Sequence, residues 1–206
     1  MEEHYYGSLW MLSSTSDERA HKLGTFAKKF RDLGLLFITN AVFNHIPVFH
    51  LRRYAEIVMT SLSYCVENQW FELYVYALMP NHIHLILKTN ENHPIGPILR
   101  DFKKFTSQQV LLTMRDADPY MLPKFQVDTN KQKYKLWVRD LDIKNIVTPG
   151  FLIQKAEYIH QNPVRAEWAD SLGINSPEDY EYSSARFYFE GIEDKYLKIS
   201  DFRELV

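Results

Sequence analysis

The sequence contains a single cysteine, Cys65, among its 206 residues. One thiol cannot form an internal disulfide and supplies no thiolate cluster, which excludes a disulfide-stabilised fold and a zinc ribbon. Any metal site must therefore use histidine, carboxylate or amide ligands. The sequence also lacks an apolar run long enough to span a membrane, and its first residues lack the pattern of a signal peptide. These absences predict a cytoplasmic protein.

An excess of one charge is absent too, because 24 Lys and Arg residues stand against 26 Asp and Glu residues, for a formal net charge of −2. This balance gives no global positive field and argues against a protein that coats nucleic acid, so only local basic patches could bind phosphates. Hydrophobic residues make up 46% of the chain. That content can bury a full core, and at this length we expect one domain.

The most informative stretch, Tyr74–Lys88, is predicted to form two strands joined at Pro80-Asn81. The second strand is apolar almost throughout except at His82 and His84. Side chains two residues apart share one face of a strand, so the imidazoles form a two-nitrogen clamp. Neutral imidazole binds Mn, Co, Ni, Cu or Zn, and the pair leaves room for oxygen ligands. The alternative is one buried, hydrogen-bonded histidine beside one at a strand end, although two polar rings in a buried strand need a compensating partner.

The other elements follow from periodicity and turn residues. We predict a helix that begins after Ser16, its N-cap, and ends at Gly34, and further helices over Leu51–Val66, Ile98–Met114 and Thr148–Gln161. Strands are expected over Leu35–Val42 and Leu136–Arg139, a turn at Asn44–Pro47, and loops over Asn90–Pro97 and Asp116–Lys135. The order strand, helix, hairpin, helix, strand, helix predicts an α+β fold with a ferredoxin-like antiparallel sheet. The strand with the two histidines should lie inside this sheet, with the last helix packed nearby.

A compact basic ridge is expected on the Ile98–Met114 helix. Arg100, Lys103 and Lys104 gather there with Ser107, at spacings of three and four that place them on one side of the helix. The ridge suits phosphate groups, and its alternative is an ordinary solvated helix face.

The end of the last helix carries Tyr158 and, four residues later, Asn162, which lie one turn apart on the same face. On the local sequence alone, Tyr158 is better explained as a half-buried core aromatic with a hydrogen-bonded hydroxyl. Its combination with the two histidines changes this interpretation.

Two motifs together resemble a known family: Met79-Pro-Asn-His-Ile-His-Leu-Ile-Leu87 and Glu157-Tyr-Ile-His-Gln-Asn-Pro-Val-Arg-Ala166. In this order and separation they are similar to the single-tyrosine transposases of the HUH (His-hydrophobe-His) class, and most of all to the REP-associated tyrosine transposases. The similarity runs from about Leu35 to Tyr188 and includes Phe43–Phe49, Leu99–Lys104, Trp137 and Tyr180–Arg186. The chain departs from the family at Glu167, where glycine is usual, and at Tyr182, where tryptophan is common.

The resemblance implies an HUH endonuclease fold with a C-terminal tyrosine-bearing helix at residues 34–190. A partly helical N-terminal extension at 1–33 and a C-terminal tail at 191–206 would flank it. It also implies that the Tyr158 hydroxyl attacks a DNA phosphodiester, giving a 5′-phosphotyrosine link and a free 3′-hydroxyl. Asn162 matches a third, amide ligand beside His82 and His84 for a divalent ion, Mg²⁺ or Mn²⁺.

The implied activity is cleavage and transfer of single-stranded DNA near hairpins, because an active site reaches unpaired DNA more easily. Arg139 and Arg165 would be phosphate contacts in addition to those of the basic ridge. The sequence leaves open whether the protein acts as a monomer or a homodimer. Two other functions also stay open: a non-catalytic DNA-hairpin-binding protein that retains the fold, and hydrolysis by a metal-bound water without a covalent step.

Overall fold

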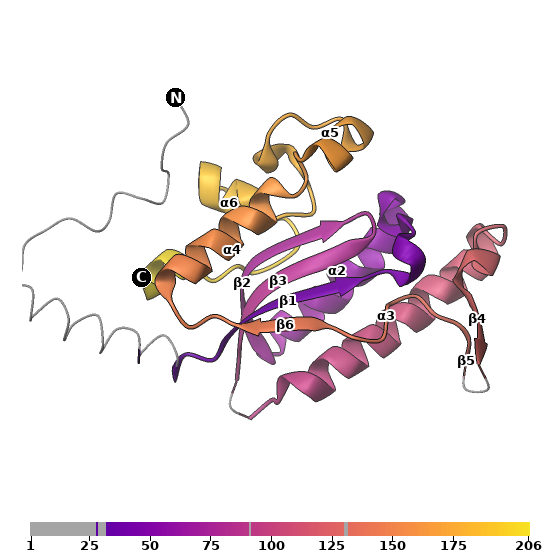
Figure 1. Ribbon diagram of the computed structural model, residues 1–206, viewed down its shortest axis with the longest axis horizontal. Helices are drawn as coiled ribbons and strands as arrows, with labels where there is room; N and C mark the ends of the chain where they lie inside the picture. Colours follow the sequence, from indigo (N-terminus) through magenta and orange to yellow (C-terminus); the bar gives the residue numbers. More distant parts are fainter. Residues whose placement is uncertain (1–27, 29–31, 91, 130–131) are drawn as a thin grey trace, which may run out of the picture.

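The computed structural model describes residues 28, 32–90, 92–129 and 132–206. Its centre is a four-stranded antiparallel sheet in the order β2-β3-β1-β6 (Figure 1). The strands are β1 (Leu35–Ala41), β2 (Phe71–Met79), β3 (His82–Thr89) and β6 (Asp142–Asn145). This order, with β3 inside the sheet, confirms the predicted α+β, ferredoxin-like arrangement. The helix expected from Ser16 to Gly34 lies, apart from residues 28 and 32–34, outside the described residues.

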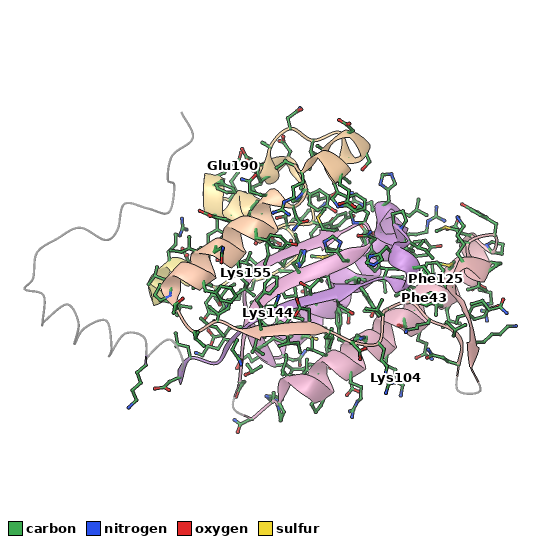
Figure 2. The ribbon with its side chains drawn as sticks, viewed as in Figure 1. Phe43, Lys104, Phe125, Lys144, Lys155 and Glu190 are labelled. Carbon is green, nitrogen blue, oxygen red and sulfur yellow. The ribbon has the colours of Figure 1, made fainter. Side chains whose placement is uncertain are left out.

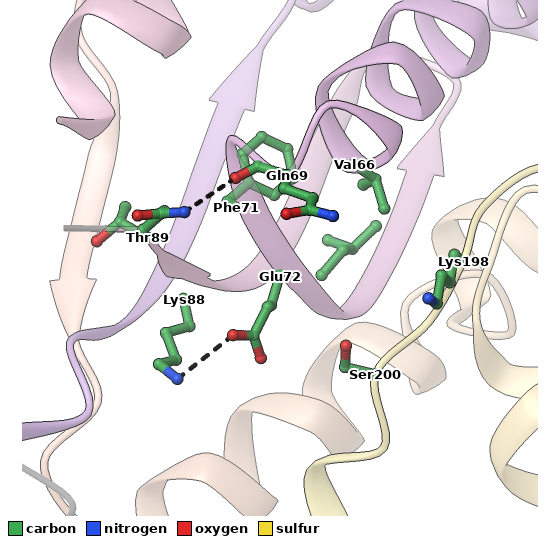
Figure 3. Close-up of a pocket in the computed structure, with 10 residues that line it drawn as sticks. Val66, Gln69, Phe71, Glu72, Lys88, Thr89, Lys198 and Ser200 are labelled. Carbon is green, nitrogen blue, oxygen red and sulfur yellow. Dashed lines mark hydrogen bonds and ion pairs between the residues drawn. The ribbon is translucent and has the colours of Figure 1, made fainter. Parts of the chain in front are cut away.

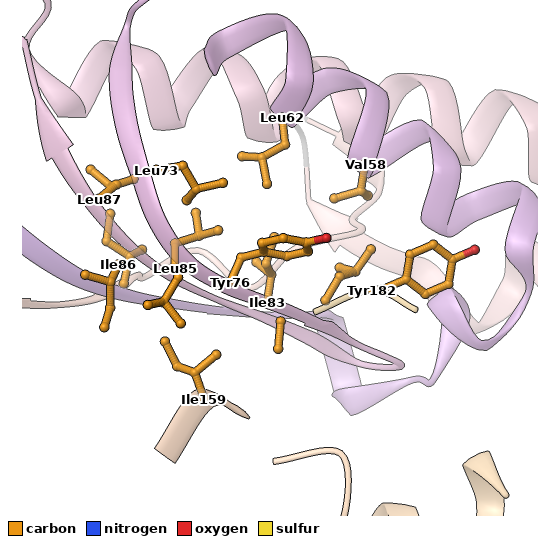
Figure 4. Packing of buried hydrophobic residues seen from close by; sticks show 14 of the residues in the cluster. Val58, Leu62, Leu73, Tyr76, Ile83, Leu85, Ile86, Leu87, Ile159 and Tyr182 are labelled. Carbon is orange, nitrogen blue, oxygen red and sulfur yellow. The ribbon is translucent and has the colours of Figure 1, made fainter. Parts of the chain in front are cut away.

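Helices cover both faces of the sheet. α2 (Arg52–Glu67) and α3 (Ile95–Ala117) pack against each other on one face, and α4 (Pro149–Gln161) lies on the other. Figure 4 shows Leu62 of α2 and Ile159 of α4 on opposite sides of the strands, each packed onto apolar side chains. No helix in the described part of the chain is long and apolar enough to cross a membrane.

Short elements complete the fold. They are the 3₁₀ helices η1 (Phe43–His45), η2 (Val48–His50), η3 (Leu122–Phe125), η4 (Pro177–Asp179) and η5 (Phe202–Leu205), the hairpin β4 (Gln126–Thr129) and β5 (Gln132–Tyr134), and the helices α5 (Ala166–Leu172) and α6 (Ala185–Glu190). The prediction of a loop over Asp116–Lys135 is therefore wrong in part, because β4 and β5 pair within it. α3 is also longer at both ends than the predicted Ile98–Met114 helix.

The predicted strand at Leu136–Arg139 is wrong. Trp137 makes only an isolated bridge to Val42, and its indole N–H donates to Thr106 Oγ1 at 2.9 Å, which holds the ring against α3. The fourth strand of the sheet is β6, whose four residues are all exposed. An edge strand without buried positions has no apolar alternation, so periodicity could not reveal it.

The opposite edge of the sheet, β2, is covered by residues near the C-terminus. The Ser184 N–H donates to the Tyr76 carbonyl at 3.1 Å, and the Ser200 N–H donates to the Leu73 carbonyl at 2.8 Å. Phe202 is buried in the same core as the strands. This segment satisfies the edge of β2 and prevents it from pairing with another chain.

Candidate active site

His82 and His84 project from β3 toward the face of the sheet that α4 covers. Their ring centroids lie 4.6 Å apart, and the His84 ring stacks on Phe37 of β1 at 5.8 Å. Strand pairing sets this arrangement, because His84 lies opposite Thr39 of β1 and Ala77 of β2. The predicted two-nitrogen clamp therefore sits in the middle of the sheet rather than at its edge.

Burial keeps both imidazoles neutral. It lowers the pKa of His82 to about 4, with a smaller contribution from nearby His45. It lowers the pKa of His84 to about 3, helped by the positive fields of His82, Arg165 and Lys155. Histidine has an ordinary pKa of about 6.5. Both rings are thus in the uncharged form that binds metal ions at neutral pH.

Each ring uses its Nδ1 atom in a hydrogen bond to a side-chain oxygen. His84 Nδ1 lies 2.8 Å from Thr39 Oγ1, and His82 Nδ1 lies 2.6 Å from Asn81 Oδ1. The other nitrogen of His84, Nε2, is buried and has no hydrogen-bond partner among the described residues. A buried ring nitrogen without a partner, beside a second neutral imidazole, is a donor set that suits a divalent metal ion.

Tyr158 reaches the histidines from α4. Its ring centroid lies 5.2 Å from that of His84 and 6.2 Å from that of Phe37, in edge contacts. The helix that carries it begins where predicted, because the Thr148 hydroxyl accepts a hydrogen bond from the Phe151 N–H at 3.2 Å. The fold therefore brings together the histidines and the tyrosine that the sequence motifs singled out.

Two cations flank the tyrosine ring. The guanidinium carbon of Arg165 lies 4.6 Å from the Tyr158 ring centroid, and the ammonium of Lys155 lies 5.2 Å from it. Arg165 was predicted as a phosphate contact from the sequence, whereas Lys155 was not. The sequence does indicate that Lys155 lies near Tyr158, because it stands three residues before Tyr158 and residues three apart on a helix share a face.

Asn162 directly follows α4 and is 5% exposed. Its Nδ2 donates to the carbonyl of Tyr158 at 3.2 Å, so the amide oxygen is the atom left to act as a ligand. Within the described residues, no group of three or more His, Cys, Asp and Glu side chains could hold a metal ion. An oxygen ligand beside the two histidines would have to be this amide, a water or a substrate.

Three of the other predicted basic residues line a separate groove of about 770 Å³ between α3 and the segment 132–141. They are Arg100, Lys103 and Arg139, and Lys135, which no sequence pattern singles out, lines the groove with them. Lys104 is exposed on α3 (Figure 2) and does not line the groove. Of the basic ridge, Arg100 and Lys103 therefore line the groove, whereas Lys104 lies on an open face of the helix.

Lys103 has a structural contact that its sequence pattern did not predict. Its ammonium donates to the carbonyls of Val138 at 2.8 Å and Arg139 at 2.9 Å, and burial lowers its pKa. Two of its three donors are therefore engaged with the backbone. The side chain holds the 138–139 segment against α3 and can offer one donor and its charge to the groove.

Another hollow, of about 460 Å³, lies at the far end of the β2–β3 hairpin (Figure 3). Glu72 and Lys88 form a cross-strand ion pair of 3.4 Å at its wall. Thr89, which also lines it, is seven residues beyond His82, which corresponds to roughly 23 Å along an extended strand. This hollow is separate from the histidine site.

Comparisons with known proteins bear on the fold. No protein-family model and no curated protein matches the sequence. Among solved structures, a REP-associated tyrosine transposase bound to a REP hairpin matches with a TM-score of 0.56 and 17% identity, over 82% of this chain and 89% of that chain. The chain has the fold of that transposase. The HUH fold that the motifs implied is thereby confirmed.

A second solved structure, of a candidate transposase from Deinococcus radiodurans R1, matches with a TM-score of 0.43 and 16% identity, over 62% of this chain and 88% of that chain. The transposase-like fold hosts the site but does not define its activity, because one fold supports many functions. The activity depends on the side chains of the site.

Proposed function

We propose that the protein is a metal-dependent endonuclease and strand transferase that acts on single-stranded DNA near hairpins through a 5′-phosphotyrosine intermediate. The observation that carries the proposal is the contact between Tyr158 and His84, whose ring centroids lie 5.2 Å apart. A nucleophile and a metal-ligand pair must be neighbours for this reaction, and they come here from separate elements, α4 and β3.

The metal ion, Mg²⁺ or Mn²⁺, would be held by His82, His84 and the amide oxygen of Asn162. The neutral state of both imidazoles and the unpartnered Nε2 of His84 support this assignment. When bound, the ion polarises a non-bridging phosphate oxygen as a Lewis acid. Because Asn162 lies one turn from Tyr158, α4 positions both the nucleophile and the third ligand, while β3 positions the two histidines.

The Tyr158 hydroxyl supplies the attacking oxygen. As its bond to phosphorus forms, its proton leaves to solvent, the bond from phosphorus to the 3′ oxygen breaks, and that oxygen takes up a proton. The products are a 5′-phosphotyrosine and a free 3′-hydroxyl. Lys155 and Arg165 lie over the tyrosine ring, where their charges attract the phosphate to the attacking atom.

DNA flanking the reacting phosphate would contact the remaining cations. Arg100, Lys103 and Arg139 line the groove beside α3, and Lys104 is exposed near it. Such contacts to the backbone position the strand without reading its sequence. The REP-associated transposase that shares this fold was solved with a REP hairpin, which supports a hairpin-bearing substrate for this chain.

The test compares wild type with Tyr158→Phe on labelled 5′-extended hairpin DNA with Mn²⁺, resolved on a denaturing gel. The variant keeps the ring contacts of Tyr158 but lacks the attacking oxygen, so we expect it to bind DNA and form neither nick nor adduct. Nicking by the variant without an adduct would indicate attack by water. If wild type forms no adduct and both proteins only bind, the protein is a hairpin-binding protein and the proposal is wrong.

A further inference from the structure

The two histidines differ in what their Nδ1 atoms contact. His84 faces a hydroxyl, Thr39 Oγ1, which can either donate or accept a hydrogen bond. His82 faces an amide atom, Asn81 Oδ1, at 2.6 Å. An amide oxygen accepts and never donates, so its contact determines which nitrogen of His82 carries the proton, provided that the amide cannot turn over.

A backbone carbonyl prevents the amide of Asn81 from turning over. Asn81 Nδ2 donates to the carbonyl oxygen of His45 at 3.2 Å, and the residue is only 9% exposed. A flipped amide would place its oxygen against that carbonyl and its NH₂ group against His82, so the observed orientation satisfies both neighbours. Asn81 therefore bridges two fixed groups and presents its oxygen to His82.

The carbonyl of His45 is itself held by an unusual turn. Asn44 and His45 have φ angles of 54° and 52°, two consecutive left-handed residues without a glycine. The chain just before this turn is held to Asn81 itself, because the Val42 N–H donates to the Asn81 carbonyl at 2.7 Å. Strained backbone of this kind persists only where the surrounding structure determines it, and it is concentrated at functional sites.

We infer that Asn81 is a positioning residue that places the proton of His82 on Nδ1 and thereby leaves the lone pair of Nε2 for a metal ion. The inference rests on the metal site of the proposed function, but its first consequence concerns the protein without metal. Hydrogen bonds from the second ring nitrogen fix the tautomer and orientation of metal-binding histidines. Here the turn at Asn44-His45 holds the amide of Asn81, and Asn81 in turn holds the ring of His82.

The direct test is the tautomer of His82 in the metal-free protein at pH 7.5, read from ¹⁵N chemical shifts and long-range ¹H–¹⁵N couplings. Wild type should show the Nδ1–H form. Asn81→Asp should keep it, because a carboxylate also accepts from Nδ1, whereas Asn81→Ala should lose the preference. His45→Gly is the matched control, because it keeps the carbonyl and tolerates a positive φ, so it should behave as wild type.

Calorimetric titration with Mn²⁺ gives a second readout. Asn81→Ala should bind about 10–100-fold more weakly than wild type, whereas Asn81→Asp and His45→Gly should bind nearly as wild type does. An Nε2–H form in wild type or in Asn81→Asp would overturn the inference, even if Asn81→Ala failed to fold. So would an Asn81→Ala protein with unchanged tautomer and affinity. If wild type bound no Mn²⁺ but Asn81→Ala still changed the tautomer, the positioning role would stand and the proposed metal site would fail.

Discussion

The guanidinium carbon of Arg165 lies 4.6 Å from the centroid of the Tyr158 ring, so a cation covers one face of the candidate nucleophile. Arg165 directly precedes α5, seven residues after Tyr158, and reaches back because α4 ends at Gln161 and the chain turns through Asn162 and Pro163. The same charge acts on His84, whose pKa is lowered mainly by burial and further by the positive fields of His82, Arg165 and Lys155.

This contact predicts separate effects of charge and shape at position 165. Arg165→Ala should weaken single-stranded DNA binding and reduce the salt dependence, by about 0.7 in log–log slope for one lost phosphate contact on a single strand. Arg165→Lys should keep the slope but cleave more slowly, because an ammonium does not stack as a planar guanidinium does. Fluorescence anisotropy across a salt series measures the first effect and single-turnover cleavage the second. Equal salt slopes for wild type and Arg165→Ala would mean that Arg165 makes no phosphate contact.

Loss of either histidine of the proposed metal site should lower the Mn²⁺ affinity more than loss of any residue that supports them. Loss of a residue that hydrogen-bonds to a metal ligand weakens metal binding about 10–100-fold, and His82→Ala and His84→Ala should weaken Mn²⁺ binding by more than this. Hairpin binding should persist, because neither substitution removes a phosphate-binding cation. Calorimetry measures the metal affinity. His160→Gln, which replaces another buried histidine, should bind metal as wild type does. Unchanged titrations in both alanine variants would show that the clamp is assigned wrongly.

The lysines of the basic ridge should differ from each other. Lys104→Gln should lower DNA affinity for all sequences alike and flatten the salt slope, because Lys104 is an exposed cation. Lys103→Met should in addition lower the free energy of unfolding, by about 1–3 kcal/mol, because two backbone carbonyls lose their donor. Urea unfolding and salt-dependent binding distinguish the two. A Lys103→Met protein as stable as wild type would mean that these hydrogen bonds do not hold the 138–139 segment.

Stability should fall in mild acid because of buried histidines. His160 is fully buried, its Nε2 lies 3.0 Å from Ser184 Oγ, and burial lowers its pKa to about 3. Below the unfolded pKa of about 6.5 the unfolded chain takes up a proton that the folded protein does not. The stabilisation from neutral His160 is therefore complete above pH 6.5 and is lost as the pH falls toward 3, at up to about 1.4 kcal/mol per pH unit.

His82 and His84 act in the same direction, since burial lowers their pKa values too. His160→Gln isolates one of the three. Between pH 6 and pH 5, its unfolding free energy should fall less steeply than that of wild type, by about one proton's worth of slope. Urea unfolding curves at several pH values measure this slope. Identical slopes for the two proteins would mean that His160 titrates alike in the folded and unfolded states.

Much of the fold could be predicted from the sequence because its main elements bury one face. β1, α2, the β2–β3 hairpin and α4 all show apolar periodicity, and the structure has them at nearly the predicted bounds. β6 could not be predicted, because its exposed residues carry no such pattern. The β4–β5 hairpin is short and pairs outside the main sheet, and its segment contains two prolines and few periodic cues, so the sequence indicated a loop.

Some residues of the candidate site could likewise be predicted from the sequence, and others could not. His82, His84 and Tyr158 stand in recognisable motifs, and the structure brings them into contact. Thr39 and Asn81 were missed as partners of the histidines. The contact of Thr39 depends on the register between β1 and β3, and that of Asn81 on a left-handed turn at Asn44-His45. Sequence spacing within one element does not contain these relations between elements.

In the proposed reaction Tyr158 becomes covalently linked to DNA. Trypsin should release residues 156–165 as one peptide, because Lys155 precedes it and Arg165 ends it, and Tyr158 is its only tyrosine. The measurement is mass spectrometry of wild-type protein incubated with hairpin DNA and Mn²⁺, then digested with nuclease and trypsin. We expect a nucleotide phosphate on Tyr158 in this peptide. A nucleotide found instead on the peptide that contains Tyr180 and Tyr182, or on no tyrosine, would contradict the account.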